Sequence, residues 1–208
     1  MKAQTKESQS ALSHENILQI LKEGNERFVN SQSLNRSLQQ QVEETSTGQF
    51  PFAAVLSCID SRVPVETVFD QGIGDLFSIR IAGNFVNDDI LGSMEFACKL
   101  AGSKVILVLG HTSCGAVKGA CDHAELGLLT GLLDKIKPAV NAVKEPVDEA
   151  LRNSKNREFV DEVATKNVSL TLEDIRTRSE VLAEMERNNE IMLVGAMYDV
   201  GSGQVTFY

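Results

Sequence analysis

Ser57-Cys58-Ile59-Asp60-Ser61-Arg62-Val63 is the stretch around which the rest of the chain is arranged. It follows an apolar run, Ala53 to Leu56, that predicts a buried strand. A second stretch, Gly110-His111-Thr112-Ser113-Cys114-Gly115, follows the apolar run Val105 to Leu109 in the same way. The carboxyl ends of neighbouring parallel strands lie at one edge of a sheet, where α/β proteins place their sites. We therefore expect the two stretches to meet in space.

Together the two stretches offer two thiols and one imidazole. Cys58, His111 and Cys114 form a Cys₂His set, which binds catalytic zinc with a fourth position left open, whereas a structural site would close that position with another Cys or His. A cysteine after a strand is often only a small buried hydrophobe, and His-x-x-Cys alone is a weak signal. Asp60 and Arg62 favour a metal site over simple core packing, because charges beside a buried strand are costly unless they pair or serve chemistry. We predict one Zn²⁺ per chain.

Three motifs taken together resemble those of the β-class carbonic anhydrases. They are Cys58-Ile59-Asp60-Ser61-Arg62-Val63, Arg80-Ile81-Ala82-Gly83-Asn84 and Gly110-His111-Thr112-Ser113-Cys114-Gly115-Ala116, and the likeness runs from about Leu21 to Tyr208. The resemblance implies a lyase that reversibly hydrates carbon dioxide to bicarbonate and a proton. It also implies that Asp60, held by Arg62, orients a zinc hydroxide nucleophile.

The resemblance further implies a substrate pocket. It is expected to contain Gln49, Phe77, Ala82, Phe96 and Gly115. Phe96 stands where a tyrosine is common in the family, so any contact by that hydroxyl is absent. Without the resemblance, Gln49 is a loop residue and the two phenylalanines are core residues.

In some relatives the aspartate leaves its arginine at low pH and binds zinc, and in one group a bicarbonate held by Trp, Arg and Tyr favours that closed state. Here Val55 stands at the Trp position, while Arg80 and Tyr198 match the other two. We expect bicarbonate-driven closure to be weak and Asp60 to lie on Arg62 at alkaline pH.

The alternation of strand and helix patterns predicts an α/β fold with a mainly parallel β-sheet flanked by helices. We expect a single domain over 1–208, with an N-terminal helical arm (1–48) and an α/β core (49–208). Strands are expected at 52–57, 76–81, 105–109, 190–200 and 204–208, the last two forming an antiparallel C-terminal edge hairpin. Helices are expected at 13–29, 64–69, 88–101, from 114, and at 126–143, 145–165 and 169–187.

The amphipathic helix after Ser13 needs a surface to cover. It packs either on its own domain or, as the resemblance suggests, across a neighbouring subunit of a homodimer or dimer of dimers.

Composition excludes some classes of binding partner and favours one cellular compartment. The 208 residues carry a net charge of -9, which argues against nucleic acid or an anionic membrane surface as a partner. No apolar run approaches the roughly 20 residues that span a bilayer, and the polar N-terminus predicts no secretory signal. Four cysteines in a chain of this length do not make a disulfide scaffold, and reduced thiols favour a cytoplasmic location.

Three alternatives remain open from the sequence. Relatives on the same fold hydrolyse carbon disulfide or carbonyl sulfide at the same kind of zinc site. A structural zinc or a redox-sensing thiol pair is a second alternative, although neither needs the poised Asp60. A flavodoxin-like nucleotide binder is a third, but this sequence has no glycine-rich loop between a strand and a helix.

Overall fold

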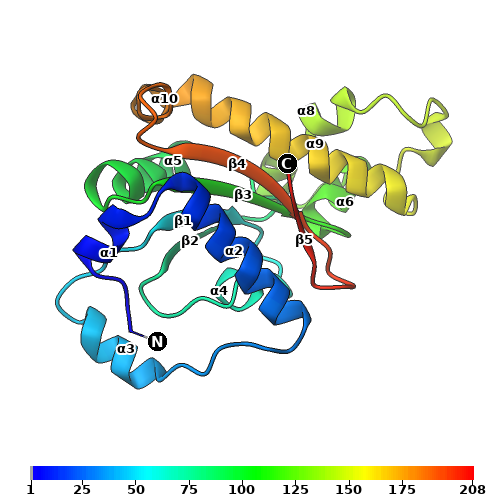
Figure 1. The fold of residues 1–208 in the computed structure, drawn as a ribbon. Helices are drawn as coiled ribbons and strands as arrows, with labels where there is room; N and C mark the ends of the chain where they lie inside the picture. The colour runs from blue at the N-terminus through cyan, green and yellow to red at the C-terminus, as the bar shows by residue number, and fades with distance from the viewer. Residues whose placement is uncertain (1) are drawn as a thin grey trace.

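The computed structural model describes residues 2–208 and is built on one five-stranded sheet with strand order β2-β1-β3-β4-β5 (Figure 1). The first four strands pair in parallel, and β5 runs antiparallel to β4 at the edge. The strands are β1 (Ala53–Ser57), β2 (Leu76–Arg80), β3 (Val105–His111), β4 (Met192–Tyr198) and β5 (Val205–Phe207). This confirms the mainly parallel sheet and its antiparallel C-terminal hairpin.

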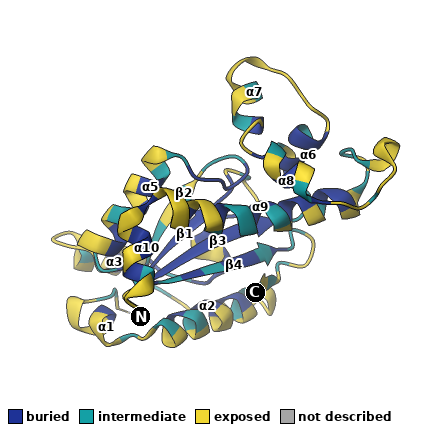
Figure 2. Ribbon diagram, turned by 90° about the horizontal axis from the view of Figure 1, so that it is seen from above, coloured by how far each residue is buried: buried dark blue, intermediate teal, exposed yellow. Residues whose placement is uncertain are grey.

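Helices cover both faces of the sheet (Figures 1 and 2). The helices are α1 (Lys6–Ala11), α2 (His14–Val29), α3 (Leu38–Thr45), α4 (Val65–Val68), α5 (Asp88–Glu95) with a π-helical turn η1 (Phe96–Leu100), α6 (Gly115–Cys121), α7 (Gly127–Leu133), α8 (Lys137–Ala142), a 3₁₀ turn η2 (Glu149–Leu151), α9 (Arg157–Arg178) and α10 (Glu180–Arg187). No helix among these described residues is long and apolar enough to cross a bilayer.

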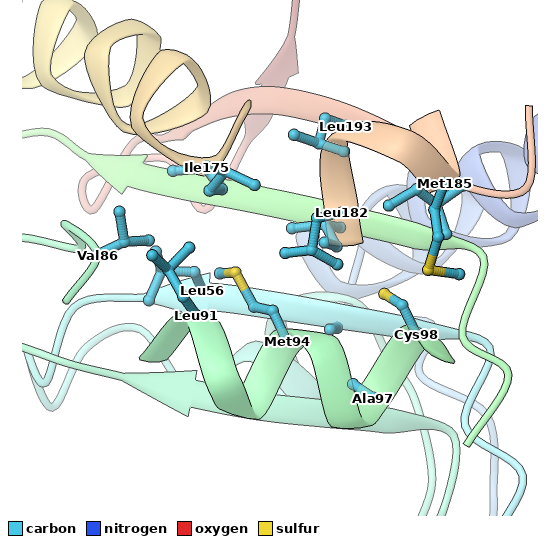
Figure 3. Close-up of a cluster of buried hydrophobic side chains, with 14 of the residues drawn as sticks. Leu56, Val86, Leu91, Met94, Ala97, Cys98, Ile175, Leu182, Met185 and Leu193 are labelled. Atoms are coloured by element: carbon cyan, nitrogen blue, oxygen red, sulfur yellow. The ribbon is translucent and has the colours of Figure 1, made fainter. Parts of the chain in front are cut away.

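The central strands are buried on both sides because their side chains alternate between two apolar clusters. Leu56 and Ile106 belong to the cluster under α5, α9 and α10, where Figure 3 shows Met94 and Leu182 among its members. Val55 belongs to the opposite cluster, with residues of α2 and α4. Each strand therefore reads as a continuous hydrophobic run in the sequence.

Helix α2 packs on its own sheet. Ser13 caps it, accepting a hydrogen bond from the amide of Asn16 in a capping box, as the sequence predicts. Ile17 and Leu21 are fully buried in the same cluster as the strands. The apolar face of α2 is thus covered by its own domain, which is one of the two arrangements expected for this helix.

One buried amide ties α2 to the C-terminal hairpin. Asn25 donates to the carbonyls of Val68 (3.1 Å) and Gly203 (2.9 Å), and its oxygen accepts from the amide of Val205 at 2.8 Å. The side chain of Asn25 therefore joins three separate segments.

Three expected helices have different bounds in the structure. The span 169–187 is divided at Ser179 into the end of α9 and the whole of α10, and Ser179 caps α10 by accepting from the amide of Leu182. The span 126–143 is two short helices, α7 and α8, with Pro138 in the first turn of α8, where a missing N–H does no harm. The span 145–165 does not form a continuous helix. Its first part is loop and η2, and α9 begins only after Asn156, whose side chain accepts from the amide of Phe159 and sets the helix start.

Candidate metal centre

The register of the sheet brings the two motif stretches together. β1 and β3 are adjacent, with Ser57 opposite Leu109, so both chains leave the sheet at the same edge. The ligand atoms of Cys58, His111 and Cys114 all lie within 4.8 Å of one another, and all three residues are buried. The predicted juxtaposition is confirmed.

The imidazole of His111 is fixed in the orientation that a metal ligand needs. Its Nδ1 lies 3.0 Å from the carbonyl of Thr112, and since a carbonyl only accepts, Nδ1 carries the proton. Nε2 then has a free lone pair, is buried, and has no hydrogen-bond partner. An unpaired buried nitrogen beside two sulfurs is costly for a purely structural histidine and fits a bound zinc ion.

The two thiols interact with each other. Their sulfurs lie 3.9 Å apart. A hydrogen bond from Cys114 lowers the pKa of Cys58, while that same bond and burial raise the pKa of Cys114. A divalent cation would replace the shared proton and hold both as thiolates.

Gly83 lies against the Cys58 sulfur in a conformation that favours glycine. Its φ is +81°, and a Cβ there would lie 2.4 Å from Cδ1 of Ile136. The Gly83 amide donates to the sulfur of Cys58 at 3.4 Å, and Asn167 on α9 donates to the Gly83 carbonyl at 2.8 Å. The motif glycine therefore brings a backbone donor to a ligand sulfur.

Asp60 is paired with Arg62. The guanidinium donates Nε to Oδ1 at 2.9 Å and Nη2 to Oδ2 at 2.7 Å, and the backbone amide of Arg62 adds a third bond at 3.0 Å. These hydrogen bonds hold the pKa of Asp60 well below its usual range. Asp60 is thus an ionised acceptor beside the cluster at neutral pH.

Arg80 supports the Cys58–Asp60 loop from β2. Its Nε donates to the carbonyl of Cys58 at 2.9 Å and its Nη2 to that of Asp60 at 2.6 Å. Tyr198, at the end of β4, is 5% exposed, and Val55 is wholly enclosed in the apolar cluster. The Val55 position offers no polar donor.

A small cavity of about 270 Å³ opens beside the metal ligands. Ala82 and Gly115 line it together with Cys58 and Asp60, so two of the expected pocket residues are brought to the site. The rest of its lining consists of Ile59 and Ala116, which lie within two of the quoted motifs, and of Gly119, Leu129 and Leu133. The last three lie on α6 and α7 outside any motif, so no local pattern marks them.

The other three expected pocket residues lie elsewhere in the single chain. Phe77 and Phe96 stack edge to face and line a separate groove between β2 and α5, and Phe96 is 51% exposed. Gln49 lines a third hollow beside α1, with Leu100 among its neighbours. None of the three is among the residues that line the cavity at Cys58.

The fold and the site define an α/β protein with a buried Cys₂His ligand set at the carboxyl ends of two parallel strands. The family model described as "Carbonic anhydrase" matches residues 53–205. "Carbonic anhydrase 2" of Mycobacterium tuberculosis is 36% identical over 187 residues, covering 88% of this chain and 87% of that protein. The β-carbonic anhydrase CafA of Aspergillus fumigatus superposes with a TM-score of 0.72 at 28% identity, over 82% of this chain and 81% of that one. The chain belongs to the β-class carbonic anhydrase family, whose members depend on zinc.

A shorter match concerns the alternative substrate. The "Carbon disulfide hydrolase" of Acidithiobacillus thiooxidans is 35% identical over 77 residues, or 34% of this chain and 36% of that protein. The extent of this likeness is much smaller than that of the carbonic anhydrase match.

Proposed function

We propose that this chain catalyses the reversible hydration of carbon dioxide to bicarbonate and a proton, using one zinc ion bound by Cys58, His111 and Cys114. The observation that carries the proposal is the unpartnered Nε2 of His111 facing two buried sulfurs, with the ionised Asp60 beside them. A zinc ion bound there would acidify a coordinated water and so supply the nucleophile near neutral pH.

The residues around the ligands would orient the nucleophilic water and compensate for the low charge of the site. Two thiolates neutralise the charge of a divalent ion, so water in this site is acidified less than in a site made of three imidazoles. Asp60 offsets that weakness by accepting a hydrogen bond from the nucleophilic water and fixing its orientation. Arg62 keeps Asp60 ionised and in place.

The cavity beside the cluster suits a small apolar substrate. Ala82 and Gly115 leave room next to Cys58, and leucines of α7 exclude water from the outer side. Carbon dioxide has no charge and no hydrogen-bond donor, so apolar walls hold it without a polar anchor.

Gln49, Phe77 and Phe96 complete the substrate pocket from a second copy of the chain in this proposal. The groove that holds Phe77 and Phe96 and the hollow that holds Gln49 both open on the surface, and Leu100, which lines the hollow with Gln49, is 77% exposed. Exposed apolar side chains beside open hollows are typical of an interface. We infer a homodimer or a dimer of dimers with its active sites at the subunit boundary.

We further propose that the enzyme works in the cytoplasm. All four cysteines are free, and Cys58 and Cys114 are close enough to be vulnerable to oxidation before zinc binds. A reducing compartment keeps the metal ligands available.

Metal analysis and a stopped-flow assay test the proposal together. The purified protein should contain one zinc per chain and hydrate carbon dioxide, and chelation should remove both properties until zinc is restored. The same assay with carbonyl sulfide and carbon disulfide separates the two substrate classes. A zinc-loaded protein that hydrolyses these sulfur compounds faster than it hydrates carbon dioxide would assign the alternative.

A further inference from the structure

The turn between the ligands His111 and Cys114 contains a strained residue. Ser113 has φ of +56°, in the left-handed region that residues with a Cβ rarely adopt. Strain of this kind persists only where the surrounding structure holds it in place. The sequence offers serine, not glycine, at this position, so some other contact must stabilise the turn.

Asp161 on α9 supplies that contact. Its Oδ1 accepts a hydrogen bond from the amide of Ser113 at 2.7 Å, which is short and charge-assisted. On the other side of the same residue, Nη2 of Arg62 approaches the carbonyl of Ser113 at 3.5 Å. The backbone of Ser113 is thus held from α9 at its N–H and approached by the Asp60–Arg62 pair at its carbonyl.

We propose that Asp161 is a positioning residue that holds the Ser113 turn left-handed and so fixes where His111 and Cys114 present their ligand atoms. Asp161 itself is not a ligand. The proposal rests on the proposed zinc site and adds a residue 47 positions beyond Cys114 that no motif marks. Loss of a contact that orients metal ligands commonly lowers metal affinity by about 10- to 100-fold.

The charge of Asp161 is a separate matter from its position. Nε of Arg157 lies 3.4 Å from Oδ2 of Asp161, and Nη2 of Arg157 lies 3.7 Å from Asp199. Arg157 is 67% exposed, so solvent screens these pairs. The proposal depends on the position of the Asp161 oxygen that accepts from the Ser113 amide. Variants that change the length and the charge of the Asp161 side chain separately test it.

Two conservative variants make that separation, and zinc affinity measured against a fluorescent chelator is the readout. Asp161→Asn keeps an acceptor oxygen in place without the charge and should bind zinc within about threefold of the unmodified protein. Asp161→Glu keeps the charge but displaces the acceptor by one methylene, and should bind zinc about tenfold or more weakly. The cobalt-substituted Asp161→Glu protein should also show a shifted visible spectrum, because its ligand geometry has changed.

A rescue variant tests the role of the turn itself. Glycine adopts positive φ without a Cβ clash, so Ser113→Gly should restore most of the zinc affinity lost by Asp161→Glu or Asp161→Ala. Asp174→Ala, which removes an exposed aspartate of the same helix, is the matched control and should leave zinc affinity unchanged.

Either of two results overturns the proposal. One is zinc affinity and a cobalt spectrum in Asp161→Glu that match the unmodified protein. The other is failure of Ser113→Gly to recover affinity in a double variant whose circular dichroism shows a folded chain. Both readouts are independent of carbon dioxide turnover, so failure here is distinguishable from failure of the proposed activity.

Discussion

Oδ2 of Asp60 lies 3.9 Å from Nε2 of His111, and that nitrogen has no hydrogen-bond partner in the described chain. The same carboxylate is held by Arg62 through two side-chain bonds. Asp60 is therefore within a short movement of a metal bound by His111, and Arg62 is what keeps it away. This relationship makes Arg62 the residue whose loss should be most informative.

Arg62→Ala should retain zinc and lose turnover. Without the guanidinium, Asp60 is free to move toward the metal and occupy the position that the nucleophile needs, and misplacement of this kind costs about 10²-fold or more in kcat/KM. Metal analysis together with stopped-flow kinetics gives both quantities on one sample. Arg187→Ala, which breaks an exposed ion pair with Glu180 on α10, serves as control. Turnover unchanged in Arg62→Ala would contradict the role given to the pair.

His111→Ala should remove the metal and the activity together. The residue supplies the only imidazole among the three clustered ligands, and its side chain is wholly buried. His123→Ala, at an exposed residue, should keep one zinc per chain. Full occupancy in the His111→Ala protein, measured by mass spectrometry of the metal, would show that the ligand assignment is wrong.

Activity should fall on acidification without any contribution from Asp60 in the neutral range. Arg62 holds the pKa of Asp60 below its usual range, so the carboxylate stays ionised and its stabilising effect is lost only when pH falls through that lowered value. The loss of rate nearer neutrality then comes from protonation of the nucleophile.

Added bicarbonate should change that pH profile little. Val55 is enclosed in the apolar cluster and offers no donor beside Arg80 and Tyr198. The measurement is kcat/KM across the neutral and alkaline range at low and high bicarbonate. A strong bicarbonate-dependent shift of the profile, beyond simple competition, would count against this account.

Thiol labelling should separate two pairs of cysteines. In the zinc-free protein at neutral pH, Cys58 should be alkylated first because the hydrogen bond from Cys114 lowers its pKa and so favours the reactive thiolate. Cys98 and Cys121 should resist, since burial raises their pKa values to about 12 and about 11. Zinc should protect Cys58 and Cys114. Peptide mapping after iodoacetamide treatment checks this, and alkylation of Cys58 at the same rate with and without zinc would contradict it.

Two inactive variants should restore activity to each other if the pocket is shared between subunits. After subunit exchange, a His111→Ala chain can supply Gln49 to a Gln49→Ala chain whose metal ligands are intact. The mixture should then exceed either parent in carbon dioxide hydration. Mixing His111→Ala with Cys58→Ala is the control, because neither chain keeps a complete ligand set and no activity should return. Absence of recovery in the first mixture, with exchange shown by light scattering and mass, would place the pocket within one chain.

The sequence was sufficient to predict the strands and the metal ligands, because both are marked by local patterns. The strand before Cys58 and the strand before His111 are continuous apolar runs, and the parallel register then brings the ligands together without further information. Asp161 and Asn167 could not be found this way, because they lie on a helix whose contact with the motif turns is set by tertiary packing.

The misplaced helix bounds also depend on features that propensity does not describe, and two other expectations stay predictions. Helix propensity did not locate the break before Pro138 or the late start of α9 at the cap Asn156. In the proposed dimer, Gln49, Phe77 and Phe96 reach the metal of a second chain, and their role in the pocket remains a prediction. The division into an arm at 1–48 and a core at 49–208 also stays a prediction, although α2 shares its buried cluster with the strands.

The hydrogen bonds of Asn25 link the N-terminal helix α2 to the C-terminal hairpin, so the two ends of the chain are coupled in stability. The amide of Val205, in the last strand, is bonded to the side chain of a residue 180 positions earlier in the chain. Fraying of β5 therefore requires the bonds of Asn25 to Gly203 and Val205 to break, and hydrogen exchange at Val205 should report loss of this contact with α2. A deletion that removes α2 would loosen the opposite terminus first.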